Sequence, residues 1–222
     1  MTPAQGYPNR VDQLAEKINI PILPCLIGKF LYSQLNPDSI NPLDNIPLTE
    51  LPVADPRSFH IFHSSVAEYY SPSDYSGDGG RCSERIRAVQ SWNNQGSRRD
   101  CLFVSKDTTT HGMANMEVAR AILFLSFTCQ GKKYPCVLVE WFTTRPERCP
   151  QTGMWIVDRD YKYDGSQSIE LVHLDTVIRG AHLIPVFGEG FVSTDLACDD
   201  SLDMYDSFYV NRYADHNAFE II

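Results

Sequence analysis

The sequence lacks several features that would assign it to a common functional class. It contains no run of eighteen or more apolar residues, which excludes a transmembrane helix. Its first residues, MTPAQGYPNR, lack the basic and then apolar pattern of a signal peptide, so an intracellular location, nuclear or cytoplasmic, is expected. The stretch SGDGG at 76–80 does not fit the phosphate-binding loop patterns, because no Lys-Ser or Lys-Thr pair follows it. Nothing in the chain therefore predicts a bound cofactor.

Metal-binding knuckles are also missing. The sequence has seven cysteines but no C-x-x-C pair and no H-x3–5-H pair, which structural zinc sites use. Cys129, Cys136 and Cys149, with His173 or His182, supply suitable residue types only at irregular spacings. An odd number of cysteines cannot pair completely, and several lie in apolar runs, as buried free thiols do. Reduced cysteines and no metal site are predicted.

Nucleophilic catalysis finds little support. No G-x-S-x-G elbow is present. The stretch HLD places His173 and Asp175 two residues apart, on one face of a strand, but no nucleophile accompanies them. A role for Asp175 as a cap before TVIRG is favoured. We expect a protein that is not an enzyme, with an enzyme of unknown type as the third hypothesis.

Charge is distributed unevenly along the chain. The net charge is −9, which argues against a protein that coats nucleic acid generally. Residues 81–106 nevertheless carry six basic and two acidic side chains, a net charge of +4, whereas residues 187–222 carry one basic and eight acidic ones, a net charge of −7. The two segments either serve two partners or pair with each other.

The basic segment is the candidate nucleic-acid-binding site. Arginines flank one tryptophan on two arms that the turn NNQG brings together. Cations around a stackable ring suit phosphate contact and the stacking of single-stranded bases. The alternative is a solvated hairpin whose arginines pair with the acidic segment. The candidate residues are Arg81, Arg85, Arg87, Trp92, Arg98 and Arg99.

Periodicity predicts three segments along the chain. Residues 1–36 read as two short helices, the first with an apolar stripe at 11, 14, 15 and 18 and the second opened by Pro24. Residues 37–57 contain evenly spaced prolines and predict an extended connector without helices. Residues 58–222 read as a β-rich domain.

Six or seven strands are expected in the third segment. The strongest signals are 100–106, 118–129 and 134–142, the last two joined by the short turn QGKK. Weaker strands fall in 153–161 and 170–173, followed by one helical turn at 175–181, and an aromatic-rich strand at 207–222 closes the chain. The predicted fold class is mainly β (α+β), a small curled antiparallel sheet or barrel with two N-terminal helices.

The stretch YPCVLVEWFTTRP at 134–146 ends a buried run in a Trp-Phe pair. We predict that Trp141 and Phe142 both close a hydrophobic core at the end of a strand, each contributing on the order of 2–3 kcal/mol. Arg145 and Pro146 then begin a turn.

The ordered motifs of the chain resemble a transposon family. From about Val11 to Ile222 the sequence is similar to the C-terminal portion of proteins from Plavaka-type elements, CACTA-like DNA transposons of mushroom-forming (basidiomycete) fungi. The resemblance implies a stand-alone, truncated or derived copy that lacks the transposase catalytic region and does not cut DNA. The motifs that carry it are FHSSVAEYYSPSDYSGDGGRCSERIRAVQSW, RRDCLFV, YPCVLVEWF, TGMWIV, HLDTVIRGAHLIPVFG and FYVNRYADHNAFE.

A looser similarity is to the bromo-adjacent homology module, a β-rich chromatin domain, through VARAILFLSF, CVLVEWFTTRPE and LDTVIRGAHLIPV. This second resemblance implies a peptide groove that binds histone or another protein. Aromatic residues are the candidates for lining it, because a methyl-lysine cage needs several exposed rings. Aromatic strand residues are more often core. The candidate partner-binding residues are Tyr134, Trp155, Tyr161 and Tyr209, with Phe208 as a neighbour.

The sequence therefore predicts a non-catalytic, transposon-derived domain that binds DNA, chromatin or a protein partner. The alternative is a structural or assembly module that packs on a transposase catalytic region or on a second copy. That alternative requires the apolar stripes of the two helices to leave a large patch uncovered.

Overall fold

The computed structural model describes residues 3–39, 42–71, 73, 79–92, 96–106, 112–188, 190–192, 194, 196 and 200–222. Its contacts group the chain into two compact units. The first unit comprises residues 1–63, 123–138 and 170–174, and the second comprises residues 64–122, 139–169 and 175–222. Three of the strands, β6 (Met116–Cys129), β7 (Lys132–Thr144) and β9 (Ile169–His173), contribute residues to both.

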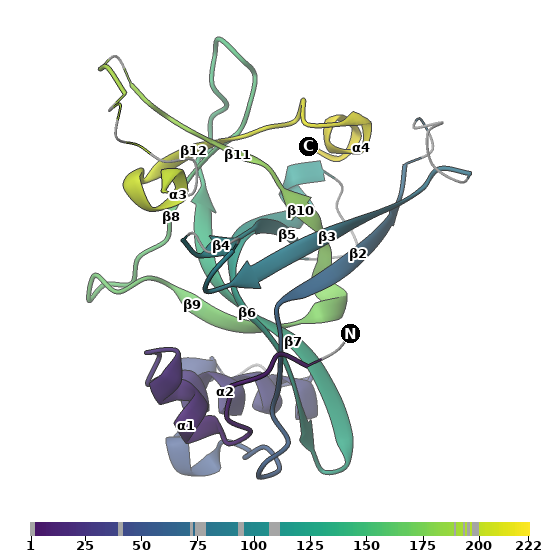
Figure 1. Ribbon diagram of the computed structural model, residues 1–222, viewed down its shortest axis with the longest axis vertical. Coiled ribbons are helices and arrows are strands. Elements are labelled where there is room, and N and C mark those ends of the chain that lie inside the picture. The colour runs from purple at the N-terminus through teal and green to yellow at the C-terminus, as the bar shows by residue number, and fades with distance from the viewer. Residues whose placement is uncertain are drawn as a thin grey trace. The chain divides into compact units, whose positions relative to one another are not determined.

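The first unit contains the two predicted N-terminal helices, α1 (Val11–Lys17) and α2 (Leu23–Leu35) (Figure 1). Pro24 lies in the first turn of α2, where its missing N–H costs no hydrogen bond. Both helices bury the middle of their apolar stripes, where Leu14, Phe30 and Leu31 are at most 6% exposed, whereas Leu35 at the end of α2 is 40% exposed. Strands β1 (His60–Phe62) and β9 (Ile169–His173) pair with β6 and β7, respectively.

The proline-rich connector differs from the prediction of a chain without helices. It contains two one-turn 3-10 helices, η1 (Leu43–Asn45) and η2 (Leu48–Glu50). Each follows a proline, Pro42 or Pro47, whose fixed φ directs the chain into a single tight turn that three residues can complete.

The second unit is built mainly from antiparallel strands. Its sheet follows the order β10-β5-β6-β7-β8-β12-β11, and a separate ribbon follows the order β2-β3-β4. Its strands other than β6, β7 and β9 are β2 (Ser64–Tyr70), β3 (Arg81–Val89), β4 (Arg98–Arg99), β5 (Cys101–Ser105), β8 (Ile156–Arg159), β10 (Val177–Ala181), β11 (Leu183–Pro185) and β12 (Ser207–Val210). Its helices are η3 (Gly112–Asn115), η4 (Leu174–Thr176, whose first residue belongs to the first unit), α3 (Ser201–Met204) and α4 (His216–Ile221).

The predicted fold class is confirmed, because the protein is mainly β and its antiparallel sheet is nearly closed into a barrel. The predicted turn between β6 and β7 is also confirmed. Its two central residues, Gln130 and Gly131, have φ angles of 53° and 77°. Positive φ at both positions is the geometry that matches a two-residue hairpin turn to the twist of its strands.

Two local predictions are wrong. Residues 175–181 do not form a helical turn; η4 ends at Thr176, and Val177–Ala181 form β10, which pairs with β5. The closing segment is not one strand, since β12 ends at Val210 and α4 follows. Asp215 caps α4 by accepting a hydrogen bond from the N–H of Ala218, and this cap starts a helix that apolar periodicity alone did not indicate.

The Trp-Phe pair is divided between core and surface. Phe142 is 6% exposed and meets the ring of Phe208 edge to face, with 5.6 Å between ring centroids. Trp141 is only half-buried, contrary to the prediction, because successive strand residues point to opposite faces of a sheet. The core around Phe142 also contains Phe103, Val157 and Val210.

Candidate functional site

The predicted arginine hairpin forms the ribbon of β2, β3 and β4. Strands β2 and β3 run side by side over the full length of β2 (Figure 1), with Ser64 opposite Arg87 and Tyr70 opposite Arg81. Strand β4 adds two residues to the other edge of β3, where Arg98 lies opposite Val89 and Arg99 opposite Ala88. The turn residues 93–95 and loop residues 76–78 lie outside the described part of the chain.

Strand alternation assigns these arginines to two faces. Arg81, Arg85 and Arg87 occupy alternate positions of β3, on the face opposite to buried Ile86. Cross-strand neighbours share a face, so Arg98 joins them and Arg99 does not. We call the side of the ribbon that carries Arg81, Arg85, Arg87 and Arg98 its outer face. It also carries two exposed apolar side chains of β2, Val66 (41%) and Tyr70 (66%).

Trp92 follows β3 and contacts two guanidinium groups. The Cζ atoms of Arg87 and Arg98 lie 4.8 and 5.2 Å from the centroid of its ring. Asp100 holds the two arginines beside Trp92, since it accepts a hydrogen bond from Nε of Arg98 at 2.8 Å and another from the backbone N–H of Arg87 at 2.9 Å. The predicted association of arginines with one tryptophan therefore exists in the folded chain.

The acidic segment 187–222 pairs with other arginines. Arg120 donates to both carboxylate oxygens of Asp203, at 2.5 and 3.0 Å, and Arg179 donates to both oxygens of Asp215, at 2.8 and 2.6 Å. Within the residues that the structure describes, no ion pair joins this segment to the outer face. The carboxylate that contacts Arg81 is Glu68, at 3.7 Å, and Arg99 lies 3.9 Å from Glu140.

Sequence reasoning missed these buried arginines, although a signal was present. Arg120 and Arg179 each stand inside an apolar strand, in VARAIL and VIRGA, and are 2% and 4% exposed. A guanidinium group in such a run needs a carboxylate partner, because an unpaired buried charge is costly. The acidic segment supplies those partners.

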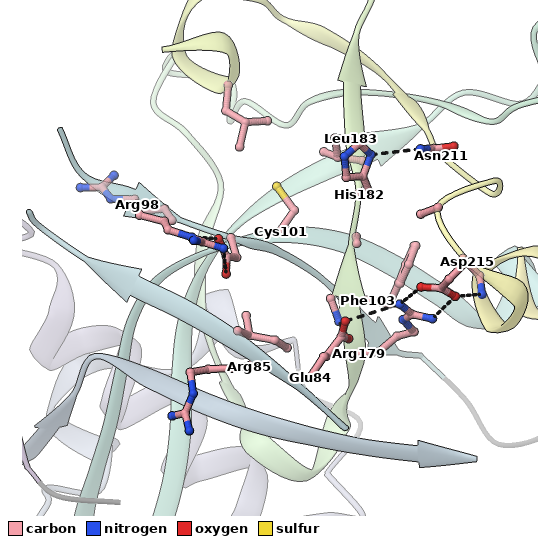
Figure 2. Close-up of a pocket in the computed structure, with 18 of the residues that line it drawn as sticks. Glu84, Arg85, Arg98, Cys101, Phe103, Arg179, His182, Leu183, Asn211 and Asp215 are labelled. Carbon is pink, nitrogen blue, oxygen red and sulfur yellow. Dashed lines mark hydrogen bonds and ion pairs between the residues drawn. The ribbon is translucent and has the colours of Figure 1, made fainter. Parts of the chain in front are cut away.

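A cavity of about 400 Å³ lies beside the ribbon, between β3, β4, β10 and the C-terminal segment (Figure 2). Arg179 forms part of its wall, where Glu84 and Asp215 approach from two sides, and the carboxylate of Glu84 also accepts a hydrogen bond from the N–H of Gly180. This part of the wall combines one guanidinium with two carboxylates, a net charge of −1.

Two further groups in the wall bear on catalysis. Burial raises the pKa of the Cys101 thiol to about 12, so it is protonated at neutral pH and is a poor nucleophile. The Nδ1 atom of His182 lies 3.2 Å from the amide nitrogen of Asn211 and accepts a hydrogen bond from it (Figure 2). Among the described residues, no group of three or more His, Cys, Asp or Glu is arranged to hold a metal ion.

The four candidate partner-binding residues do not share one environment. Tyr134 belongs to the first unit, is 2% exposed and packs against Phe30 and Phe127, so it is a core residue. Tyr161 is 49% exposed. Trp155 and Tyr209 are half-buried, and burial raises the pKa of Tyr209.

Trp155 has Arg148 over its ring, with 4.5 Å from Cζ to the centroid, and its buried indole N–H lacks an acceptor in the described structure. Of the four predicted rings, no two form a ring pair in the part of the chain that the structure describes. Tyr134, a core residue, therefore does not line an exposed groove, whereas partner binding by Trp155, Tyr161 and Tyr209 stays a prediction. His173, which the sequence analysis considered for catalysis and for metal binding, stacks on Phe30 in the first unit, with 6.4 Å between ring centroids.

Comparisons with protein-family models, with curated proteins and with solved structures give no match to this chain. In the described residues, no helix has the length and apolar character needed to cross a membrane.

Proposed function

We propose that this protein binds nucleic acid through the outer face of the ribbon and has no catalytic role. One observation carries this proposal. The described carboxylates of the acidic segment that form ion pairs are bound to Arg120, Arg159 and Arg179, so they do not neutralise the outer-face arginines.

The charge of the outer face supports the proposal. The outer face carries four arginines and two carboxylates, Glu68 and Asp100, which pair with Arg81 and Arg98. Among the described residues, the guanidinium groups of Arg85 and Arg87 form no ion pair with a carboxylate. Arg85 donates to Ser64 at 3.0 Å and Arg87 to the carbonyl of Arg85 at 3.4 Å. Guanidinium groups without internal counterions can release counterions from phosphates when they bind a nucleic acid strand.

Two aromatic rings add a contact that suits single strands. Tyr70 is exposed at the end of β2, and Trp92 carries the guanidinium groups of Arg87 and Arg98. Unpaired bases stack on such rings with little dependence on sequence, whereas a duplex hides its base faces. Single-stranded nucleic acid is therefore the favoured ligand. The assembly alternative gains no support, because Leu14, Phe30 and Leu31 are buried within the first unit.

The test is binding of the purified protein to a single-stranded oligonucleotide and to a duplex, at about 50 and 200 mM salt. The R85A/R87A double variant is expected to weaken binding and to reduce the slope of log K against log salt by about 1.4 for a single strand. The matched control is R148A, which also removes an exposed arginine stacked on a tryptophan but lies outside the ribbon. Equal binding by both variants would reject the ribbon, and no binding by the wild-type protein at about 50 mM salt would reject the function.

A further inference from the structure

Two arginines from two strands of the second unit lie against one carboxylate, that of Asp203, and the charge of a third arginine, Arg99 of β4, also acts on it. Arg120 of β6, with its side chain 3% exposed, makes the two hydrogen bonds to Asp203 described above. Arg159 of β8, 9% exposed, lies 3.8 Å from the same carboxylate. The pKa of Asp203 is held below its usual range, first by the hydrogen bonds from Arg120 and then by the positive charges of Arg120, Arg159 and Arg99. Asp203 thus lies in a strongly positive environment.

The fixed carboxylates near this site do not balance its charge. Glu140 lies 3.9 Å from Arg99, which is longer than a hydrogen bond, and Asp206 lies 3.9 Å from Arg159 with its own side chain 85% exposed. Without Asp203, three guanidinium groups would face one well-buried carboxylate, Glu140. An anion is therefore required at the position that Asp203 occupies, since buried unpaired arginines are costly.

The segment that supplies Asp203 is short and partly exposed. Helix α3 has four residues, too few to be stable by itself, and the side chain of Asp203 is 54% exposed. Besides the ion pair, the segment is held by Arg159, whose guanidinium donates to the carbonyls of Leu202 and Tyr205. Water and solutes can reach the carboxylate, so a competing anion can reach the same guanidinium groups.

The arginines also have donor capacity that Asp203 does not use. The Nε–H of Arg120 is buried and has no acceptor among the described residues. Arg159 is also held from outside α3, because the amide of Gln167, oriented to fit its neighbours, accepts from Arg159 at 2.6 Å and donates to Glu140 at 3.0 Å. A tetrahedral oxyanion offers more acceptor oxygens than a carboxylate and suits guanidinium groups that are already in place.

We propose that Arg99, Arg120 and Arg159 form a phosphate-binding site that the Asp203 carboxylate occupies as an internal ligand in this structure. The group that replaces it is a phosphate, either free or part of a nucleic acid backbone. Arg99 follows Arg98 of the outer face but points to the opposite side of the ribbon, so a nucleic acid strand bound to the outer face would have to pass around the edge formed by β4 to reach the site. The free-phosphate form of this proposal does not depend on nucleic acid binding.

The first experiment compares wild-type protein with D203N and with the control D206N, which removes an exposed carboxylate next to the site. The midpoint of thermal unfolding is measured against inorganic phosphate at constant ionic strength, with chloride as the balancing anion. D203N is expected to bind phosphate at least tenfold more tightly than the wild-type protein, and D206N is expected to resemble the wild type. If D203N is unfolded in chloride, phosphate is expected to restore its circular dichroism spectrum. A folded D203N that responds to phosphate no more than D206N overturns the proposal, as does an unfolded D203N that phosphate does not rescue.

The second experiment identifies the source of the phosphate. A single-stranded oligonucleotide is titrated with wild-type protein, with D203N and with the ribbon variant R85A/R87A. Tighter binding by D203N, with a salt slope increased by about 0.7, assigns the site to a backbone phosphate. Tighter binding of inorganic phosphate alone assigns it to a free phosphate. Loss of binding in R85A/R87A without any effect of D203N on either ligand refutes the site and retains the ribbon.

Discussion

Arg179 and Asp215 form a two-point ion pair that fastens the C-terminal helix to the sheet. Arg179 belongs to β10, and Asp215 is the N-cap of α4. The guanidinium donates to both oxygens of the carboxylate, while Oδ1 also accepts the N–H of Ala218 at 2.8 Å. One carboxylate therefore neutralises a buried arginine and begins a helix.

Replacing Asp215 by asparagine is expected to destabilise the protein by about 2–3 kcal/mol. This is less than the loss of about 3–5 kcal/mol for a fully buried pair, because Asp215 is partly exposed and Glu84 stays 3.4 Å from Arg179. Asparagine preserves the cap, so the loss reports the charge. Urea unfolding measures it, with D206N as a nearly neutral control. Equal stability of the two variants would contradict this account of the pair.

Acid is expected to destabilise the protein through three aspartates. Hydrogen bonds from Arg145, Arg120 and Arg179 lower the pKa values of Asp158, Asp203 and Asp215, respectively. A carboxyl group with a lowered pKa in the folded state stabilises that state above its unfolded pKa, about 3.9 for aspartate. Stability is therefore constant near neutral pH with respect to these groups and is lost as pH falls below about 4. Thermal unfolding between pH 7 and pH 2.5 measures this loss, and a midpoint that stays constant over the acid range would be inconsistent with the pairing.

The two residues of the Trp-Phe pair should respond differently to truncation. F142A removes a buried ring that contacts Phe208, and a loss of about 3–5 kcal/mol is expected. W141A removes a half-buried ring, for which a loss of about 1–2 kcal/mol is expected. Chemical denaturation of both variants compares the two values directly. A larger loss for W141A would restore the interpretation made from the sequence.

Gly28 is expected to resist replacement although it lies inside a helix. A Cβ atom there would lie 2.9 Å from Cβ of Leu51, so G28A forces the connector away from α2. Overpacking costs about 1–3 kcal/mol, and alanine returns about 1 kcal/mol through helix propensity. A net loss of about 1 kcal/mol is expected, with exposed Q34A as the control in the same helix. A G28A variant more stable than the wild type would show that Leu51 yields easily.

Sequence periodicity predicted the elements whose burial pattern is regular. The apolar runs at 118–129 and 134–142, and the turn between them, appear as β6, β7 and their hairpin. The second predicted helix, opened by Pro24, appears as α2. Local patterns suffice here because each of these elements buries a large part of its own residues.

The misassigned elements depend on distant partners. Residues 177–181 form a strand because they pair with β5 at the edge of the sheet. Helix α4 depends on the pairing of its N-cap, Asp215, with Arg179. For the candidate site, alternation could separate Arg99 from the outer face, but the sequence could not tell which arginines the acidic segment neutralises. That choice is made by tertiary contacts between segments far apart in the chain.

The two-residue turn at Gln130 and Gly131 has a consequence for folding kinetics. Strands β6 and β7 are adjacent in sequence and paired in the sheet, so their loop closure costs little entropy. Strands β1 and β10 must find their partners across much longer stretches of chain, as in the pairing of His60 with Ser126. We expect the β6–β7 hairpin to be formed in the folding transition state, so destabilising mutations in the hairpin would slow refolding while mutations in β10 would mainly accelerate unfolding.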